Sequence, residues 1–243
     1  MSRIEFENLG IAFDIGSKKG VKDILIPGSQ RFSKIESGTI YALKSINLTI
    51  KDGERLAIIG HNGAGKSTIL KVMAGIYAPT TGTVKTQGRV SAMFELATGF
   101  EMEQSGWDNI YLRGLMLGET PKGIIDKMQE IAEFSELGEF LNMPVKYYSS
   151  GMFIRLAFSV STAIEPDILL LDEVVASGDA AFIAKAKKRM NDMIEKTKIV
   201  VLVTHGMGDA IALCNRCIWM EQGNILMDGT PKDVTEAYTR SVL

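Results

Sequence analysis

The sequence is poor in cysteine and histidine and contains no long apolar run. It has 2 cysteines and 2 histidines among 243 residues, too few cysteines for a disulfide framework. Its longest uninterrupted apolar runs, such as 168–171 and 199–203, are far shorter than the ~20 residues that cross a bilayer. The N-terminus also lacks the basic-then-apolar pattern of a secretory signal. We therefore expect a cytosolic protein without a membrane span.

The charge of the chain is balanced rather than dominated by one sign. Lys and Arg total 27 against 29 for Asp and Glu, which gives a net charge of -2. Proteins that bind duplex nucleic acid usually carry a basic excess, so we expect no nucleic-acid partner. With 46% apolar residues, 24 glycines and 6 prolines, the composition is that of a globular protein, and the length fits one large domain or two small lobes.

The two cysteines stand close together as Cys214-Asn215-Arg216-Cys217, a spacing that also occurs in redox and zinc sites. A zinc site would need two further ligands, and His61 and His205 both lie in other motifs. We therefore interpret the pair as small apolar residues at a helix-to-strand junction.

The first hundred residues mix strands with one helix. Apolar and polar residues alternate over 3–12 and 45–51, which predicts two half-buried strands. Asp52-Gly53 predicts a tight hairpin that returns the chain as a strand over 55–59. An apolar helix is expected after Lys66.

Helical spacing begins at Ser105 and gives way to alternating strands and helices after Pro166. Helix starts are expected at Ser105 and at Thr120, which precedes Pro121, and a further helix is expected over 153–163. The elements after Pro166 imply a parallel sheet: strand 167–172, helix 180–195, strand 198–204, helix 207–213, a hairpin at Gly223 and a helix from Pro231.

A phosphate-binding motif lies between the strand that ends at Ile59 and the first helix. Residues 60–67 fit G-x-x-x-x-G-K-[ST] in the strand, loop and helix context that this Walker A motif requires. Glycines let backbone N–H groups converge on phosphates, Lys66 reaches the β and γ oxygens, and Ser67 is placed for Mg²⁺. The candidate nucleotide-binding residues are Gly60, His61, Asn62, Gly63, Ala64, Gly65, Lys66, Ser67 and Thr68, with His61 at a variable position.

A second motif, residues 168–173, is an all-apolar stretch that ends in two carboxylates, as a strand buried between helices does. Asp172 would hold Mg²⁺ through water, and Glu173 would orient or deprotonate the attacking water. The alternative interpretation of the two carboxylates is a solvated acidic turn, and the presence of a phosphate-binding motif in the same chain favours the catalytic interpretation over it. The main hypothesis is a nucleotide hydrolase.

The segment Tyr148-Ser149-Ser150-Gly151-Met152, with Gly151 lying 21 residues before Asp172, resembles the L-S-G-G-Q signature of ATP-binding cassette (ABC) proteins. Ser149 and the N–H groups of Ser150 and Gly151 at a helix start form an anion site. This site cannot bend back to its own phosphate loop and would serve the other protomer. The resemblance implies a head-to-tail homodimer with two shared ATP sites.

That resemblance covers nearly the whole chain. It implies an α/β P-loop NTPase fold with a RecA-like parallel-sheet core, an antiparallel β subdomain and an α-helical subdomain. The chain would be a single nucleotide-binding domain over 1–243, with about 1–100 and 165–243 in the catalytic lobe and about 101–164 in the helical lobe.

Several single residues take roles from this resemblance. Asp179 occupies the place of the D-loop and would link the protomers, while His205 takes the place of the switch histidine that contacts the γ-phosphate. Tyr41, 25 residues before Lys66, would stack on adenine, although a core tyrosine is an equal alternative. Glu95 stands where the family has a glutamine, and a carboxylate there could still ligate Mg²⁺.

Three segments of the chain resemble one branch of this family, the ATPase subunits that export polysaccharide from bacteria. The matching segments are F-E-L-A-T-G-F, Y-S-S-G-M and D-E-V-V-A-S-G-D-A-A-F. The resemblance implies export of a lipid-linked polysaccharide, with O-antigen as the first choice, by two copies of the chain under two copies of a membrane permease. The chain would lie on the cytoplasmic face of the inner membrane, with a permease coupling helix seated at about 95–118.

Two further expectations concern the segment 16–36 and the C-terminus of the sequence. The basic segment 16–36 would lie near the membrane and admit a lipid-diphosphate headgroup, or would be a solvated loop. The chain stops at Leu243, which leads us to expect export without an appended carbohydrate-binding domain.

Three rival functions remain. A drug or small-molecule exporter would share every nucleotide motif but should not need the segment 16–36. A soluble cassette protein of translation or DNA repair would normally carry two cassettes or a long coiled coil. An isolated P-loop kinase would leave residues 148–152 without a purpose.

Overall fold

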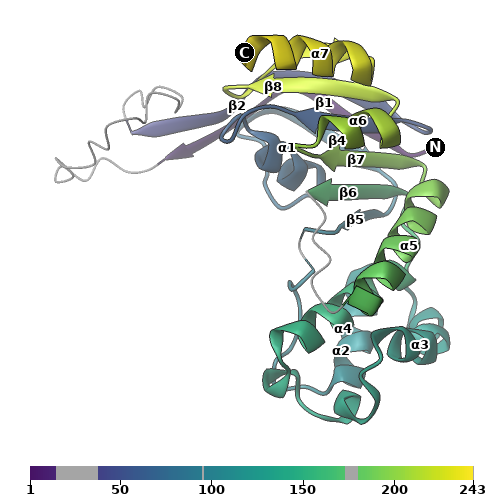
Figure 1. The fold of residues 1–243 in the computed structure, drawn as a ribbon. Coiled ribbons are helices and arrows are strands. Elements are labelled where there is room, and N and C mark those ends of the chain that lie inside the picture. The colour runs from purple at the N-terminus through teal and green to yellow at the C-terminus, as the bar shows by residue number, and fades with distance from the viewer. Residues whose placement is uncertain (15–37, 95, 173–179, 243) are drawn as a thin grey trace, which may run out of the picture. The chain divides into compact units, whose positions relative to one another are not determined.

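The computed structural model describes residues 1–14, 38–94, 96–172 and 180–242. Backbone contacts divide the chain into two compact units (Figure 1). The first unit comprises 1–88 and 198–243, and the second comprises 89–197. Glu95, Glu173, Asp179 and the basic segment 16–36 lie outside the described residues.

The first unit contains a three-stranded antiparallel sheet. Its strands are β1 (Arg3–Asp14), β2 (Thr39–Lys51) and β4 (Thr81–Gln87), in the order β2-β1-β4. Opposite Ile4 on β1 lies Ile50 on β2, and both are fully buried, as period-two patterning predicts. The two strands expected over 3–12 and 45–51 are therefore confirmed, and each extends further than the sequence indicated.

The remaining strands of this unit form two parallel pairs and one antiparallel pair. Strand β3 (Arg55–Ile59) pairs parallel with β7 (Ile199–Val203) and with β8 (Arg216–Glu221), while β9 (Asn224–Gly229) runs antiparallel to β8. The predicted hairpin that pairs 45–51 with 55–59 is therefore wrong. Gly53 has the expected positive φ of 85°, but residues 56–59 are fully buried, which suits a central strand of a parallel sheet.

The described residues of this unit also form the helices α1 (Lys66–Met73), α6 (Met207–Leu213) and α7 (Pro231–Val242). Helix α7 lies along β8 in Figure 1. Its Val234 joins a buried cluster with Ala57 and Cys217, and Tyr238 packs against the same cluster. Among the described residues, no helix is both long enough and apolar enough to be a bilayer span.

The second unit, as far as the structure describes it, combines short parallel strands with a group of helices. The strands are β5 (Val90–Ala92) and β6 (Ile168–Asp172). The helices are α2 (Gly106–Met116), α3 (Pro121–Ser135), α4 (Ser150–Ala163) and α5 (Ala180–Lys196), with 3-10 turns at Gly138–Asn142 and Val145–Tyr147.

The predicted helix caps of this unit are confirmed. Ser105 and Asp108 form a reciprocal capping box at the start of α2, which satisfies N–H groups that the helix itself cannot bond. The Thr120 hydroxyl accepts from the N–H of Gly123 at the start of α3, and Pro121 occupies the first helical position.

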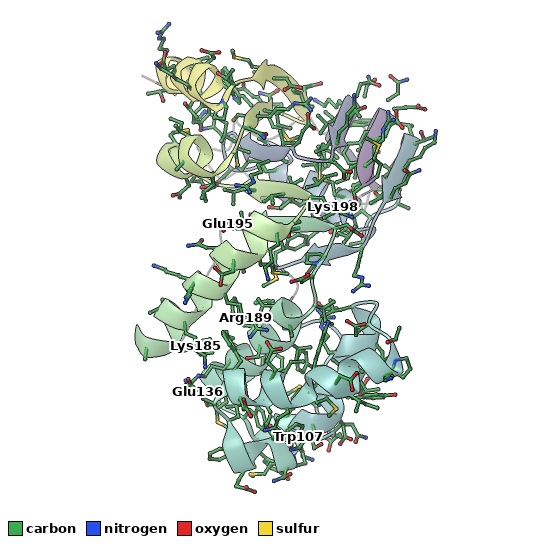
Figure 2. All side chains as sticks on the ribbon, turned by 90° about the vertical axis from the view of Figure 1, so that its right-hand side faces the viewer. Trp107, Glu136, Lys185, Arg189, Glu195 and Lys198 are labelled. Atoms are coloured by element: carbon green, nitrogen blue, oxygen red, sulfur yellow. The ribbon has the colours of Figure 1, made fainter. Side chains whose placement is uncertain are left out.

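The core of this helical bundle is built from fully buried aliphatic side chains. They lie on α2, α3 and α4 and include Ile110, Ile124, Ile131, Leu156 and Val160. Burying each such side chain contributes about 1.5–3 kcal/mol. Trp107 of α2 is partly buried and packs against this cluster (Figure 2).

Candidate functional site

The loop between β3 and α1 has a backbone shape that requires glycine. Gly60, Gly63 and Gly65 have positive φ values of 147°, 81° and 104°, which side chains disfavour. A Cβ atom on Gly60 would lie 2.1 Å from the backbone oxygen of Met220, and one on Gly65 would lie 2.8 Å from that of Ala42. The loop is therefore held closely against neighbouring backbone.

Lys66 folds its ammonium group back over this loop. The side chain is 6% exposed, and Nζ donates to the carbonyl oxygens of Gly60 at 2.7 Å and His61 at 2.9 Å. A phosphate oxygen would be a stronger partner than these carbonyls, because both groups of the hydrogen bond would carry charge. The ammonium group of Lys66 therefore lies next to the position where the motif predicts phosphate.

Helix α1 begins at this loop in a way that favours an anion. Its N-cap, Gly65, provides no side-chain cap, and its first turn contains no acidic residue. The first N–H groups of a helix have no acceptor within the helix, and the helix dipole places positive potential there. The site chemistry therefore fits a nucleotide phosphate.

The ring of His61 is in contact with the C-terminal helix. Its Nδ1 lies 3.4 Å from the hydroxyl oxygen of Tyr238, and the two ring centroids are 5.4 Å apart. Trp219 of β8 meets the Tyr238 ring edge-on at 5.5 Å. Sequence analysis placed His61 at a variable position and did not find this contact.

Tyr41 and His205 are both exposed in the first unit. The Tyr41 side chain is 46% exposed on β2, which does not fit the alternative of a core tyrosine. His205 lies two residues beyond the end of β7, as predicted. The neighbouring N–H of Gly206 donates to the Thr204 hydroxyl at 2.9 Å, which shapes the turn that presents the imidazole.

The signature segment lies in the second unit at the start of α4. Ser149 is the N-cap, and its hydroxyl accepts from the N–H of Met152 at 3.3 Å. The helix begins at Ser150, three residues earlier than the sequence predicted, so Ser150 and Gly151 occupy the first helical positions. Their N–H groups have no acceptor within the helix, which is the arrangement expected of an anion site.

Tyr148 anchors the residue before this N-cap. Its hydroxyl donates to the Phe140 carbonyl oxygen at 2.8 Å, and burial raises the pKa of Tyr148 to about 12. The phenol therefore stays protonated and remains a donor at physiological pH.

Asp172 is the last residue of β6 and is partly buried, after four buried apolar residues. The first unit thus carries the phosphate loop, Tyr41 and His205, and the second carries Asp172 and the signature segment. The expected roles of Glu95, Glu173 and Asp179 concern residues outside the described chain.

Asn109 is a buried polar residue that sequence analysis missed. It is fully buried, its Nδ2 donates to the carbonyl oxygens of Glu101, Gln104 and Ser105, and its Oδ1 accepts from the N–H of Glu101. This side chain fixes the loop 101–105, inside the segment predicted to receive a coupling helix. A buried asparagine leaves no signal in an apolar periodicity.

The two cysteines are poor candidates for chemistry. Burial raises the pKa of the Cys214 thiol to about 11 and that of Cys217 to about 12. Both thiols therefore stay protonated at neutral pH, whereas nucleophilic attack and metal binding need the thiolate. This agrees with their interpretation as packing residues.

Comparisons with known proteins agree on one family. A family model described as ABC transporter matches residues 43–176. The O-antigen export system ATP-binding protein RfbB of Klebsiella pneumoniae is 42% identical over 94% of this chain and 92% of its own length. The teichoic acids export ATP-binding protein TagH of Listeria monocytogenes is 36% identical over 99% of this chain and 70% of its own length.

Solved structures show the same fold. A dimeric ATP-binding cassette in a post-hydrolysis state, bound to ADP and Pi, matches with a TM-score of 0.67 at 22% identity, over 94% of this chain and 98% of that one. The ATP-binding subunit of an ABC transporter matches with a TM-score of 0.70 at 20% identity, over 97% of this chain and 93% of that one. The predicted α/β cassette fold is confirmed, and the chain belongs to the ABC transporter family.

Proposed function

We propose that this chain is the ATP-hydrolysing subunit of a bacterial exporter of lipid-linked polysaccharide, with O-antigen as the first candidate. The observation that carries the proposal is its likeness to polysaccharide-export relatives over nearly its full length. These relatives favour polysaccharide export over the rival drug exporter.

ATP is the proposed nucleotide, and the phosphate loop is its proposed site. Residues 60–68 would surround the phosphates, and the Lys66 ammonium would exchange the carbonyl oxygens of Gly60 and His61 for phosphate oxygens. Tyr41 would stack on adenine, for which its exposure on β2 is suitable. Water would add to the γ-phosphorus as the bond to ADP breaks, and Glu173 would take the proton of that water.

A magnesium ion would be held by Ser67, Asp172 and Glu95, since hydroxyl and carboxylate oxygens are suitable ligands for this ion. When bound, the ion neutralises charge that develops on the phosphate oxygens. His205 would contact the γ-phosphate from the end of β7 and register its loss.

The proposed assembly is a homodimer beneath two copies of a separate permease, at the cytoplasmic face of the inner membrane. The anion site at Ser149, Ser150 and Gly151 would serve the nucleotide of the partner protomer, and Asp179 would link the protomers. Support comes from the α4 start and from the dimeric cassette that shares this fold. The permease coupling helix would contact residues 95–118, and lipid-linked polysaccharide would reach the chain only through the permease.

The proposal is tested by replacing the wild-type chain with Glu173→Gln in source cells and locating the undecaprenyl-linked glycan. We expect glycan to accumulate inside and to disappear from the surface, because nucleotide would bind without turnover. The purified variant should retain ATP affinity and should form an ATP-dependent dimer that persists.

The control is the wild-type chain expressed at the same level. Normal surface glycan with a proven loss of ATPase activity would overturn polysaccharide export and would support the small-molecule rival. Unchanged ATP turnover in Glu173→Gln would remove this residue from the mechanism.

A further inference from the structure

Glu136 connects two helices that are distant in sequence. It follows α3 in a left-handed conformation, with φ of 56°. One carboxylate oxygen accepts from Nη2 of Arg155 on α4 at 2.6 Å, and the other accepts from Nζ of Lys185 on α5 at 2.9 Å. Figure 2 shows Lys185 and Glu136 next to each other. We call Glu136, Arg155 and Lys185 the clasp.

Aromatic rings support the clasp. Phe134, Phe158 and Phe182 form a triad with centroids 5.9 to 6.2 Å apart. The Arg155 guanidinium lies 4.8 Å from the Phe182 ring centroid, and Lys185 Nζ lies 4.5 Å from that of Phe134. Cation–π contacts of this kind add to the ion pairs and restrict the long side chains to one geometry.

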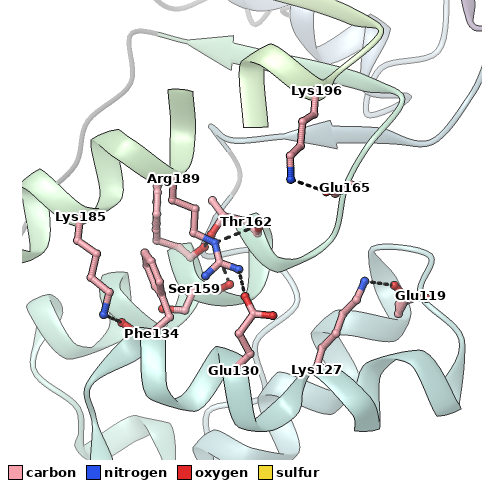
Figure 3. A network of polar contacts seen from close by, with 11 residues as sticks. Glu119, Lys127, Glu130, Phe134, Ser159, Thr162, Glu165, Lys185, Arg189 and Lys196 are labelled. Atoms are coloured by element: carbon pink, nitrogen blue, oxygen red, sulfur yellow. Dashed lines mark hydrogen bonds and ion pairs between the residues drawn. The ribbon is translucent and has the colours of Figure 1, made fainter. Parts of the chain in front are cut away.

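A neighbouring contact strengthens the junction between α3 and α5. Arg189 donates to Glu130 at 2.7 Å and lies 4.3 Å from the Phe134 ring centroid (Figure 3). The side chains of Arg189 and Arg155 are only 18% and 20% exposed. Their carboxylate partners Glu130 and Glu136 are 62% and 47% exposed, so each ion pair is open to solvent on its carboxylate side, and the junction depends on several such contacts acting together.

The clasp residues Arg155 and Lys185 lie near the starts of their helices. Helix α4 begins directly after Ser149, and Arg155 lies in its second turn. Helix α5 begins directly after the segment 173–179, and Lys185 also lies in its second turn. The two helices that leave the proposed anion site and the proposed water-activating segment are therefore joined through one carboxylate.

We propose that the clasp residues are positioning residues that hold the start of α4 to the start of α5. The first turns of α4 and α5 then keep one spacing when the signature end of α4 meets the nucleotide of the partner protomer. Small displacements of reacting or binding groups, of about 1 Å, can lower rates as much as ~100-fold. This inference rests on the proposed function, because it assumes that the signature serves a partner.

The test uses the full chain and two clasp variants. Glu136→Gly removes the carboxylate but places glycine where the backbone is left-handed, which favours folding. Lys185→Met removes the second ion pair, and Lys188→Met on the same helix, where the side chain is exposed, is the matched control. Each is made in the wild-type chain for kcat and in the Glu173→Gln background for ATP-dependent dimerisation by analytical ultracentrifugation.

We expect both clasp variants to weaken ATP-dependent dimerisation about fivefold, as loss of roughly 1 kcal/mol would do, and to lower kcat. Nucleotide binding by the monomer, measured with a fluorescent ATP analogue, should stay unchanged, because the phosphate loop is intact. Lys188→Met should match its parent chain in every measurement.

Two results would overturn the inference and leave the proposed function standing. One is that both clasp variants keep the kcat of the wild-type chain and dimerise as strongly as the Glu173→Gln parent. The other is that kcat falls only to the extent that the melting temperature falls. If the Glu173→Gln chain without a clasp change binds ATP but does not dimerise, the proposed shared ATP site is refuted, and the inference about the clasp is refuted with it.

Discussion

The hydroxyl oxygen of Tyr238 lies 3.4 Å from Nδ1 of His61. This contact joins the last helix of the chain to the phosphate loop across 177 residues of sequence. The backbone carbonyl of the same His61 accepts from Lys66. Tyr238 therefore supports His61, the loop residue whose carbonyl oxygen binds the Lys66 ammonium group.

Removing this support should weaken ATP binding more than turnover. We expect Tyr238→Phe, which keeps the ring but loses one hydrogen bond of roughly 0.5–1 kcal/mol, to raise the KM for ATP about threefold. Tyr238→Ala should raise it further and lower stability by roughly 2 kcal/mol, because the ring also packs against Trp219. Steady-state ATPase kinetics and urea unfolding measure the two effects.

Tyr147→Ala serves as the matched control, since that side chain is 65% exposed in the other unit. A Tyr238→Ala chain with the KM of the wild type would show that α7 has no influence on the phosphate loop.

The glycines of the phosphate loop should differ in tolerance. Gly60→Ala would place Cβ 2.1 Å from the Met220 backbone oxygen, so we expect loss of more than about 3 kcal/mol or failure to fold. Gly63→Ala meets nothing within 4 Å and should cost only the ~1–2 kcal/mol of left-handed backbone strain. Equal unfolding midpoints for the two variants in urea would contradict this ranking.

Asn109→Asp should destabilise the loop 101–105. The substitution would replace a donor with a carboxylate oxygen facing the carbonyl oxygens of Glu101, Gln104 and Ser105, and a buried unsatisfied charge costs roughly 3 kcal/mol or more. Protonation of the new carboxyl restores a donor, so the loss should be smaller at pH 5 than at pH 8. Urea unfolding at both pH values tests this, with Asn142→Asp, on an exposed residue, as the control.

The cysteines should be slow to alkylate in the folded protein. Folding raises the pKa of Cys214 from 9.0 to about 11, so about one thiol in a thousand is ionised at pH 8. The reaction with iodoacetamide should accelerate about tenfold per pH unit up to pH ~11. Because folding favours the protonated Cys214 thiol, this preference contributes its full stabilising free energy below pH 9. The contribution is lost as the pH rises through 11. Alkylation of the native chain at pH 7 as fast as of the unfolded chain would refute the shift.

Local signals predicted the local structure well. Ser105 and Asp108 are three positions apart, Thr120 directly precedes Pro121, and each pair marks the helix start found in the structure. The glycine-rich loop was likewise readable, because positive φ at Gly63 and Gly65 follows from residue type and motif spacing.

Pairing between distant segments was harder to predict. Asp52-Gly53 forms a turn, but β3 pairs with β7 and β8 rather than with β2. The turn signal describes two residues, whereas the choice of partner depends on burial of residues 56–59 on both faces of the sheet. A turn motif carries no information about that burial.

The sequence by itself determined the family, the phosphate loop, the start of α4 to within three residues and the helix caps, because each depends on short spacings along the chain. Only the tertiary structure decided that Tyr238 supports His61 and that Glu136 holds both Arg155 and Lys185. These partners are 19 to 177 residues apart, and a charge or a ring that packs on a distant helix has no periodicity of its own. Chain folding brings them together, and so the contacts that position the site appear only in three dimensions.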